Sequence, residues 1–257
     1  MGTIIKTEEL SIAFGGHLAV NNVSVEIKRN TFTSVIGPNG AGKTTFFNLL
    51  SGQLSPTSGR VIYKEEDITK QSVIERTRNG IGRSFQITNV FPNITVLENV
   101  RLAVQSRERV RFDLFRHFKN YKQFEEEAMS LLKMVLLEEK AEIPAATLSH
   151  GEKRKLEIAM LLALNTEVLL LDEPTAGMSL EEVPAILNVI ENIKDQGDRT
   201  VVLIEHKMDM VLNLSDRMMV LFNGELLAEG TPEEIMNNET VQTAYIGGDP
   251  NVTTATT

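Results

Sequence analysis

The chain of 257 residues contains no cysteine, so neither a disulfide nor a thiolate-bound metal can form. It also has no apolar run approaching the roughly 18 residues that a membrane-spanning helix needs. We expect no secretory signal peptide, because Lys6 and Glu8 interrupt any apolar core near the start. If this protein serves a membrane, it must therefore do so through a partner.

Positive charge is scarce as well. The chain has 26 lysines and arginines against 35 aspartates and glutamates, which gives a formal net charge of −9. Phosphate backbones attract basic surfaces, so this balance argues against general nucleic-acid binding, and we expect no nucleic-acid partner. Hydrophobic residues make up 42% of the chain, which is ordinary for a soluble protein.

Residues 37–44 form the most informative stretch, because they match the G-x-x-x-x-G-K-[ST] phosphate-binding loop at every fixed position. A β-rich segment precedes the loop, and residues 45–50 have the apolar spacing of a helix start. The glycines let the backbone wrap closely around phosphate oxygens, while successive N–H groups and the helix N-terminus supply positive potential. We expect Lys43 to reach the β- and γ-phosphates and the Thr44 hydroxyl to ligate Mg²⁺.

The loop therefore predicts that the chain binds a nucleoside triphosphate, and the alternative is a glycine-rich turn that merely precedes a helix. The residues expected to contact the nucleotide here are Gly37, Pro38, Asn39, Gly40, Ala41, Gly42, Lys43, Thr44 and Thr45.

Residues 167–173 read as an apolar strand that ends in two carboxylates. A buried parallel strand has such a continuous apolar run, and its carboxyl end opens onto the ligand crevice. Asp172 then suits Mg²⁺, held directly or through a water, and Glu173 suits the group that orients or deprotonates the attacking water. The alternative is that the acidic pair merely solvates a strand end.

Leu148-Ser149-His150-Gly151-Glu152 stands before an evident helix that runs to Leu164. Ser149 at the N-cap with Glu152 three residues on is a capping-box pattern, and such a helix start attracts anions. Gly151 allows close approach because it lacks a Cβ. Together these motifs resemble those of the ATP-binding subunits of ABC transporters, whose signature is most often Leu-Ser-Gly-Gly-Gln. The resemblance implies that Ser149 and Gly151 face the γ-phosphate of ATP held by a partner subunit.

The resemblance extends over nearly the whole chain and implies further roles. Phe14 stands where the family stacks an aromatic ring on adenine, and Gln86 matches the glutamine that senses the γ-phosphate near the membrane partner. His206 matches the histidine that contacts the γ-phosphate, and residues 176–179 match the loop that crosses the dimer interface. The alternatives are a core phenylalanine, a surface amide and a satisfied loop histidine. The expected catalytic residues are Lys43, Gln86, Glu173 and His206, and the expected Mg²⁺ ligands are Thr44, Gln86 and Asp172.

Three positions depart from the commonest family pattern. His150 replaces a glycine, Glu152 replaces a glutamine, and Ser179 replaces the usual aspartate of the interface loop. We favour His150 as a solvent-facing residue without a catalytic role, because its neighbours already supply the phosphate contacts.

The coarse organisation predicts an α/β fold: a P-loop nucleotidase core with a parallel sheet, an N-terminal antiparallel β layer and a helical subdomain. The antiparallel strands are expected from about residue 4 to 36, with residues 61–63 continuing that layer. Thr95 to Glu98 resembles a capped helix start, Asn223-Gly224 predicts a two-residue hairpin turn, and Thr231 to Glu234 predicts the start of a short helix with proline in its first turn. We expect one ABC ATPase domain over 1–257, composed of a core (1–91 and 148–230), a helical subdomain (92–147), a C-terminal helical extension (231–250) and a disordered tail (251–257).

Residues 107–122 interleave six cations with four aromatic rings at helical spacing. The favoured interpretation is an amphipathic helix with solvated cations, and the alternatives are a surface near anionic lipid or a permease, or nucleic-acid binding.

Several segments resemble the ATPases of branched-chain amino-acid importers, namely residues 83–86 with 89–100, 156–160, the interface loop and 245–248. Urea and short-chain amide importers share most of these features. The resemblance implies ATP and Mg²⁺ as cofactors, and as partners integral membrane permease subunits, a second ATPase subunit (identical or different) and, indirectly, an external solute-binding protein. It implies a peripheral location on the cytoplasmic face of the cell membrane. The alternative is a soluble ABC-type ATPase that is not coupled to a permease.

Overall fold

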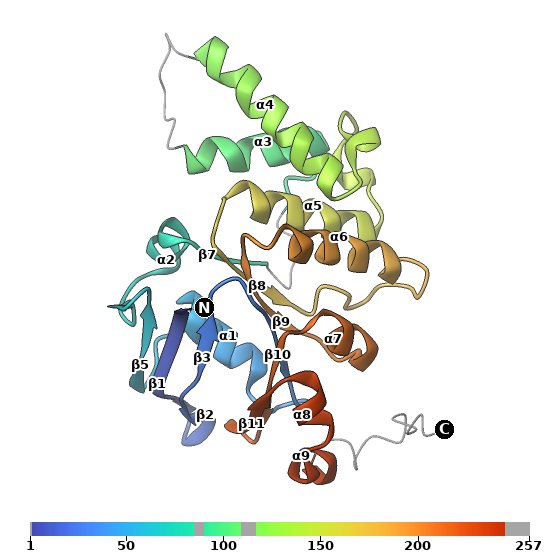
Figure 1. Cartoon of the computed structure of the whole chain (residues 1–257). Coiled ribbons are helices and arrows are strands. Elements are labelled where there is room, and N and C mark those ends of the chain that lie inside the picture. Colours follow the sequence, from blue (N-terminus) through green and yellow to red (C-terminus); the bar gives the residue numbers. More distant parts are fainter. Residues whose placement is uncertain (1, 85–89, 109–116, 245–257) are drawn as a thin grey trace. The chain divides into compact units, whose positions relative to one another are not determined.

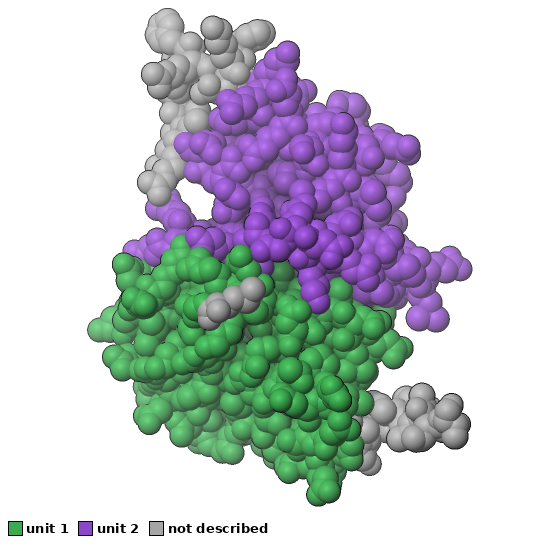
Figure 2. Space-filling model, in the orientation of Figure 1, with its two compact units in different colours: residues 1–73, 200–257 green, residues 74–199 purple. Residues whose placement is uncertain are grey.

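A computed structural model describes residues 2–84, 90–108 and 117–244, with only the backbone described for 117–121. The chain forms two compact units, residues 1–73 with 200–257 and residues 74–199 (Figure 1, Figure 2). Each unit is described by itself below.

The first unit contains an antiparallel sheet of short strands. Its strands are β1 (Thr3–Phe14), β2 (His17–Val23), β3 (Glu26–Lys28), β5 (Ser58–Tyr63) and β6 (Glu66–Asp67), in the order β2-β1-β5-β6 with β3 paired to β1. The β1–β2 turn uses Gly15 and Gly16, both with positive φ, which glycine adopts at no steric cost. The expected antiparallel layer, including its continuation in residues 61–63, is confirmed for these strands.

The same unit holds four further strands: β4 (Phe32–Ile36), β9 (Thr200–Ile204), β10 (Arg217–Phe222) and β11 (Glu225–Gly230), in the order β11-β10-β4-β9. β4 runs parallel to both neighbours, with Thr33 opposite Arg217 and Val202. The expectation that the antiparallel layer continues to residue 36 was therefore wrong for this strand. All five β4 residues are buried, as is typical of an inner parallel strand covered on both faces.

The helices of this unit are α1 (Lys43–Ser51), α7 (Met208–Leu214), α8 (Pro232–Met236) and α9 (Glu239–Ala244). Residues from α7, α8, α9, β4 and β10 share one apolar cluster, which includes Ile36, Val211, Val220, Ile235 and Val241. The cluster ties the C-terminal helices to the sheet strand that leads into the phosphate loop, so that loop starts from a rigid base.

Two local predictions in this unit are confirmed. Asn223 and Gly224 form the two-residue turn of the β10–β11 hairpin, both with positive φ. Thr231 caps α8 in a reciprocal capping box with Glu234, and Pro232 occupies the first turn.

The second unit is mainly helical. Its elements are α2 (Val73–Asn79), β7 (Ile81–Arg83), α3 (Val96–Arg107), α4 (His117–Met134), α5 (His150–Ala163), β8 (Val168–Asp172) and α6 (Val183–Gln196), with 3₁₀ turns at Glu138–Lys140 and Ala145–Thr147. β7 and β8 pair in parallel, and α3 lies beside both α4 and α5 (Figure 1). Thr95 caps α3 by accepting the Glu98 N–H at 3.1 Å, which confirms the capped start expected there.

Only the two ends of the basic-aromatic segment fall among side chains that the structure describes. Arg107 donates two hydrogen bonds to the Glu127 carboxylate of α4, at 2.7 and 2.9 Å, and one to the Ala163 carbonyl at 3.0 Å. This cation therefore joins α3 to α4 and α5. The remaining alternatives for the segment, and the expected disordered tail at 251–257, fall on residues outside the described ranges.

In the described ranges every helix is too short or too polar to cross a bilayer.

Candidate nucleotide-binding and catalytic site

The start of α1 is a helix N-terminus without a side-chain cap. Gly42 occupies the N-cap position with φ 96°, a conformation that L side chains rarely adopt. A Cβ at Gly42 would lie 2.3 Å from the Ala19 carbonyl oxygen, and one at Gly37 would lie 2.1 Å from that of Leu221. Close packing against these two carbonyls therefore requires glycine at both positions. Gly42 has no side chain that could cap the first amides of α1, so this helix start is suited to an anion.

Lys43 lies across the opening of the same loop. Its Nζ donates to the carbonyl oxygens of Gly37 at 2.7 Å and Pro38 at 3.0 Å, and the residue is 6% exposed. Thr44 and Thr45 on the following turn are half-buried, while Asn39 and Gly40 are exposed. The loop thus combines a fixed ammonium group with an exposed glycine-rich tip.

Phe14 ends β1 and is 49% exposed, so it is a strand residue that lies outside the core. His206 lies two residues beyond the buried strand β9 and is exposed, and its backbone N–H donates to the Glu205 carboxylate at 3.0 Å. The stacking role of Phe14 and the phosphate contact of His206 stay predictions.

Asp172 and Glu173 belong to the second unit, at the carboxyl end of β8. The Asp172 carboxylate is fully buried, and its Oδ2 accepts a hydrogen bond from Arg83 of the parallel strand β7 at 2.8 Å. Burial raises the pKa of Asp172, and the Arg83 guanidinium opposes that rise. Arg83 was not expected to have a role, because the sequence pattern does not show which residues meet across neighbouring strands.

The Asp172 carboxylate fits a magnesium ligand. Its Oδ1 is buried and has no hydrogen-bond partner among the described residues. An unsatisfied buried carboxylate oxygen suits a hard cation, and Mg²⁺ commonly takes one or two carboxylates together with substrate phosphates and waters. Among the described residues, no group of three or more Asp, Glu, His or Cys side chains is arranged so that it could hold a metal ion by itself.

The turn that carries Glu173 is held from α5. Glu173 has φ 46°, an uncommon value for a residue with a side chain. Buried Arg154 donates to three successive carbonyls, those of Asp172 at 3.0 Å, Glu173 at 3.1 Å and Pro174 at 3.4 Å, and also to the Glu157 carboxylate at 2.7 Å. Sequence reasoning missed this positioning residue, although its place on the apolar face of α5 marks it as an unusual arginine.

Ser149 caps α5 as expected. Its hydroxyl accepts the Glu152 N–H at 3.2 Å, and its own N–H donates to the Glu152 carboxylate at 3.0 Å. Glu152 also forms an ion pair with Lys140, which explains a carboxylate where the family commonly has glutamine. His150 is exposed, with its ring next to Gly177, which agrees with the favoured solvent-facing interpretation.

Glu182, just before α6, contacts this helix start and was not expected there. Its Oε1 accepts from the Ser149 hydroxyl at 3.1 Å and from the Gly151 N–H at 3.3 Å. Its Oε2 accepts from the Ser179 N–H and hydroxyl, both at 3.3 Å. Hydrogen bonds, that from the Ser179 N–H foremost, lower the pKa of Glu182. Ser179, the departure in the interface loop, thus has a defined partner.

The site residues divide between the two units. Phe14, residues 37–45 and His206 lie in the first unit, and Ser149, Gly151, Asp172 and Glu173 lie in the second. Gln86 lies outside the described residues, so its roles as phosphate sensor and metal ligand stay predictions.

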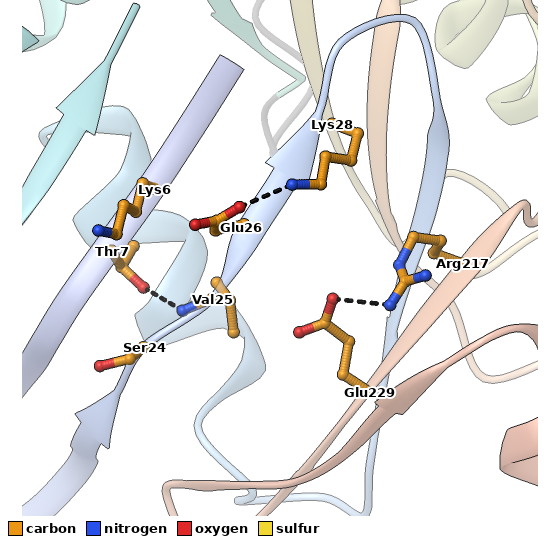
Figure 3. A pocket seen from close by; sticks show the side chains of 8 residues that line it. All are labelled: Lys6, Thr7, Ser24, Val25, Glu26, Lys28, Arg217 and Glu229. Carbon is orange, nitrogen blue, oxygen red and sulfur yellow. Dashed lines mark hydrogen bonds and ion pairs between the residues drawn. The ribbon is translucent and has the colours of Figure 1, made fainter. Parts of the chain in front are cut away.

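An unrelated pocket in the first unit has no phosphate-loop residue among the described residues that line it (Figure 3). Its three cations each have a carboxylate partner: Lys6 pairs with Glu8, Lys28 with Glu26, and Arg217 with Glu229. With its charges already matched, this pocket is a poor site for a triphosphate.

Comparison with known proteins decides the family. The sequence profile described as "ABC transporter" matches residues 20–176, more than half of the chain. A high-affinity branched-chain amino acid transport ATP-binding protein, LivG of Salmonella typhimurium, is 38% identical over 95% of this chain and 98% of its own length. The chain belongs to the ABC transporter family.

Solved structures agree with this membership. The ADP conformation of an ATP-binding cassette of an ABC transporter superposes with a TM-score of 0.80 at 31% identity, covering 96% of this cassette and all of that chain. A dimeric cassette in a post-hydrolysis state, bound to ADP and phosphate, superposes with a TM-score of 0.76 at 27% identity, over 89% of this cassette and 99% of that chain. The expected α/β fold class and the expected class of enzyme, an ATPase subunit of a transporter, are thereby confirmed.

A second profile, described as "Branched-chain amino acid ATP-binding cassette transporter", matches residues 225–250. The match covers strand β11 and helices α8 and α9 of this cassette. Its last residues, 245–250, lie outside the described ranges.

Proposed function

We propose that this cassette is the ATP-hydrolysing motor of an importer for branched-chain amino acids or a related small nitrogenous solute. The observation that carries the proposal is the buried Asp172 carboxylate, next to Glu173 on a strained turn. One Asp172 oxygen is paired with Arg83, and the other has no hydrogen-bond partner among the described residues. Together with an uncapped α1 start in a family of ATPase subunits, this arrangement supports metal-assisted phosphoryl transfer.

Each side chain has a proposed part in that chemistry. Lys43 exchanges its contacts with loop carbonyls for β- and γ-phosphate oxygens, and residues 37–45 surround the phosphates with backbone N–H groups. Phe14 stacks on the adenine, and His206 and Gln86 contact the γ-phosphate. Glu173 orients or deprotonates the attacking water. Thr44, Gln86 and Asp172 would hold Mg²⁺, which would supply positive charge to neutralise the phosphate groups.

We further propose that two cassettes, identical or different, meet head to tail around the nucleotides. Ser149 and Gly151 of one cassette then donate to the γ-phosphate bound by the other. A solved relative at 27% identity is described as dimeric with ADP and phosphate, which supports this proposal. Hydrolysis needs closure because one face alone leaves part of the developing charge without donors.

The permease contact is proposed for a small cavity of the second unit. The cavity has a volume of about 140 Å³ and is lined by Arg83, Ser84, Ala103, Glu157, Met160, Leu161 and Leu164. Phe91, which is 56% exposed, is tied to α3 through two hydrogen bonds between its backbone and the Asn99 amide. A cavity lined mainly by apolar side chains and, separately, an exposed aromatic ring each suit contact with a helix of a membrane partner. We propose on this basis that the cassette lies peripherally on the cytoplasmic face of the membrane.

The solute is proposed from the relatives, since the cassette never touches it. The profile that matches residues 225–250 and the LivG relative are both named for the transport of branched-chain amino acids. Recognition of the solute is assigned to the permease and to an external binding protein.

Gene deletion with uptake of labelled leucine and labelled urea tests the assignment. We expect leucine uptake to fall to background and to return with the wild-type chain but not with Glu173→Gln, while urea uptake stays unchanged. Loss of urea uptake alone would show that the solute is urea and not a branched-chain amino acid. Unchanged uptake of both solutes, with copurification of ribosomes or DNA and no integral membrane partner, would establish the soluble alternative.

A further inference from the structure

The signature segment, residues 148–152, contains the groups proposed to donate hydrogen bonds to phosphate. These groups already donate hydrogen bonds within the chain. The Ser149 hydroxyl and the Gly151 N–H both donate to Oε1 of Glu182, at 3.1 and 3.3 Å. Each of these groups has a single hydrogen to donate, so neither can serve a phosphate oxygen at full strength while it binds this carboxylate.

The Glu182 carboxylate occupies the place of an anion at the start of α5. It accepts four hydrogen bonds, two through each oxygen, and hydrogen bonding holds its pKa below the ordinary value, so it is charged at neutral pH. A Cβ at Gly151 would lie 2.9 Å from Oε1, so the missing side chain at this position admits the carboxylate. Two anions at one such site repel each other.

We propose that Glu182 is an internal competitor for the γ-phosphate of the partner's ATP. It satisfies the signature segment in the free cassette and must release Ser149 and Gly151 before these donors can bind the phosphate. The inference rests on the proposed function, because it takes the γ-phosphate as the ligand of these donors. Glu182 acts through Ser149 and Gly151, so it is a positioning residue.

The same carboxylate connects the signature segment to the interface loop. Oε2 is bound by Ser179, which stands where the family usually has aspartate. Glu182 can therefore release the α5 start and keep its Ser179 contacts. Release costs the free cassette two charge-assisted hydrogen bonds, and this cost lowers its apparent affinity for phosphate.

Glu182→Gln removes the charge and keeps the shape, so the side chain still has an oxygen for the same donors. The direct test follows the Gly151 amide by NMR as inorganic phosphate is added to the isolated chain at constant ionic strength. We expect the variant to respond at about tenfold lower phosphate than wild type, since a neutral acceptor holds the donors less tightly. Glu181→Gln, an exposed neighbour, is the matched control and should titrate like wild type.

A response at the same phosphate concentration in wild type and Glu182→Gln, or a weaker response in the variant, would overturn the proposal. The Ser149→Ala, Glu182→Gln double variant should lose the gain, because one of the two donors is gone. If the gain persisted there, the phosphate would be binding elsewhere.

The assembled transporter supplies a second readout. Glu182→Gln should lower the ATP concentration for half-maximal hydrolysis with kcat largely kept, whereas a structural cap alone would predict a lower Tm and an unchanged or raised KM. If the wild-type transporter neither binds nor hydrolyses ATP, the proposed function fails, while the phosphate titration still decides whether Glu182 competes for an anion.

Discussion

The chain has two helix starts to which phosphate binding is assigned, and they are built in opposite ways. α1 begins after Gly42, with no side-chain cap, and its neighbouring cation is held by loop carbonyls. α5 begins after Ser149 with a complete capping box, and it also holds the Glu182 carboxylate. The start of α1 is therefore open to an anion, whereas side chains of the cassette itself accept the hydrogen bonds that the start of α5 donates.

This difference matches the two tasks proposed for the helix starts. A loop that binds the nucleotide phosphates directly benefits from an open, rigid cradle, because little has to be rearranged when phosphate arrives. A helix start that meets phosphate only in the closed dimer is exposed to water for part of the cycle, and internal caps keep it folded then.

The largest expected effect comes from Lys43→Ala, which removes the cation from the open start. We expect ATP hydrolysis to fall by about a hundredfold or more, because no other charge in the loop replaces the contact to the transferring phosphoryl group. Lys28→Ala is the matched control, since Lys28 is a half-buried lysine in the same unit that pairs with Glu26. Equal activities of the two variants would remove Lys43 from the catalytic set.

Gly42→Ala tests whether glycine keeps the α1 start open. The new Cβ would lie 2.3 Å from the Ala19 carbonyl oxygen at a φ of +96°, so we expect a loss of about 2 kcal/mol in the free energy of unfolding and weaker ATP binding. Gly16→Ala has a similar φ of +87° but nothing within 4 Å, so it separates backbone strain from the clash. Chemical denaturation of both variants is the measurement, and equal losses would contradict the close approach.

Ser149→Ala has the smallest expected effect on stability, about 1 kcal/mol, the ordinary cost of losing an N-cap. Thr231→Ala removes the equivalent cap of α8 and should cost a similar amount. We expect only Ser149→Ala to reduce ATP hydrolysis. If both variants kept full activity, Ser149 would be a cap and nothing more.

Sequence reasoning succeeded where the signal is local. The phosphate loop, the Ser149 and Thr231 caps and the Asn223-Gly224 turn each depend on residues within a few positions of one another. It missed the contacts of Arg83 with Asp172, of Arg154 with the carbonyls of residues 172–174, and of Glu182 with Ser149 and Gly151, which join residues 18 to 89 positions apart. The parallel direction of β4 was missed for the same reason, since its partners β9 and β10 come from the far end of the chain.

Glu173→Gln offers the most direct measurement of the central claim, that this cassette hydrolyses ATP with Glu173 as the group that activates water. The change keeps the shape of the side chain and removes its ability to take a proton. The account predicts near-normal ATP binding, turnover about a hundredfold or more slower than wild type, and an ATP-dependent closed dimer detected by its mass in solution. Near-normal turnover in this variant would contradict it.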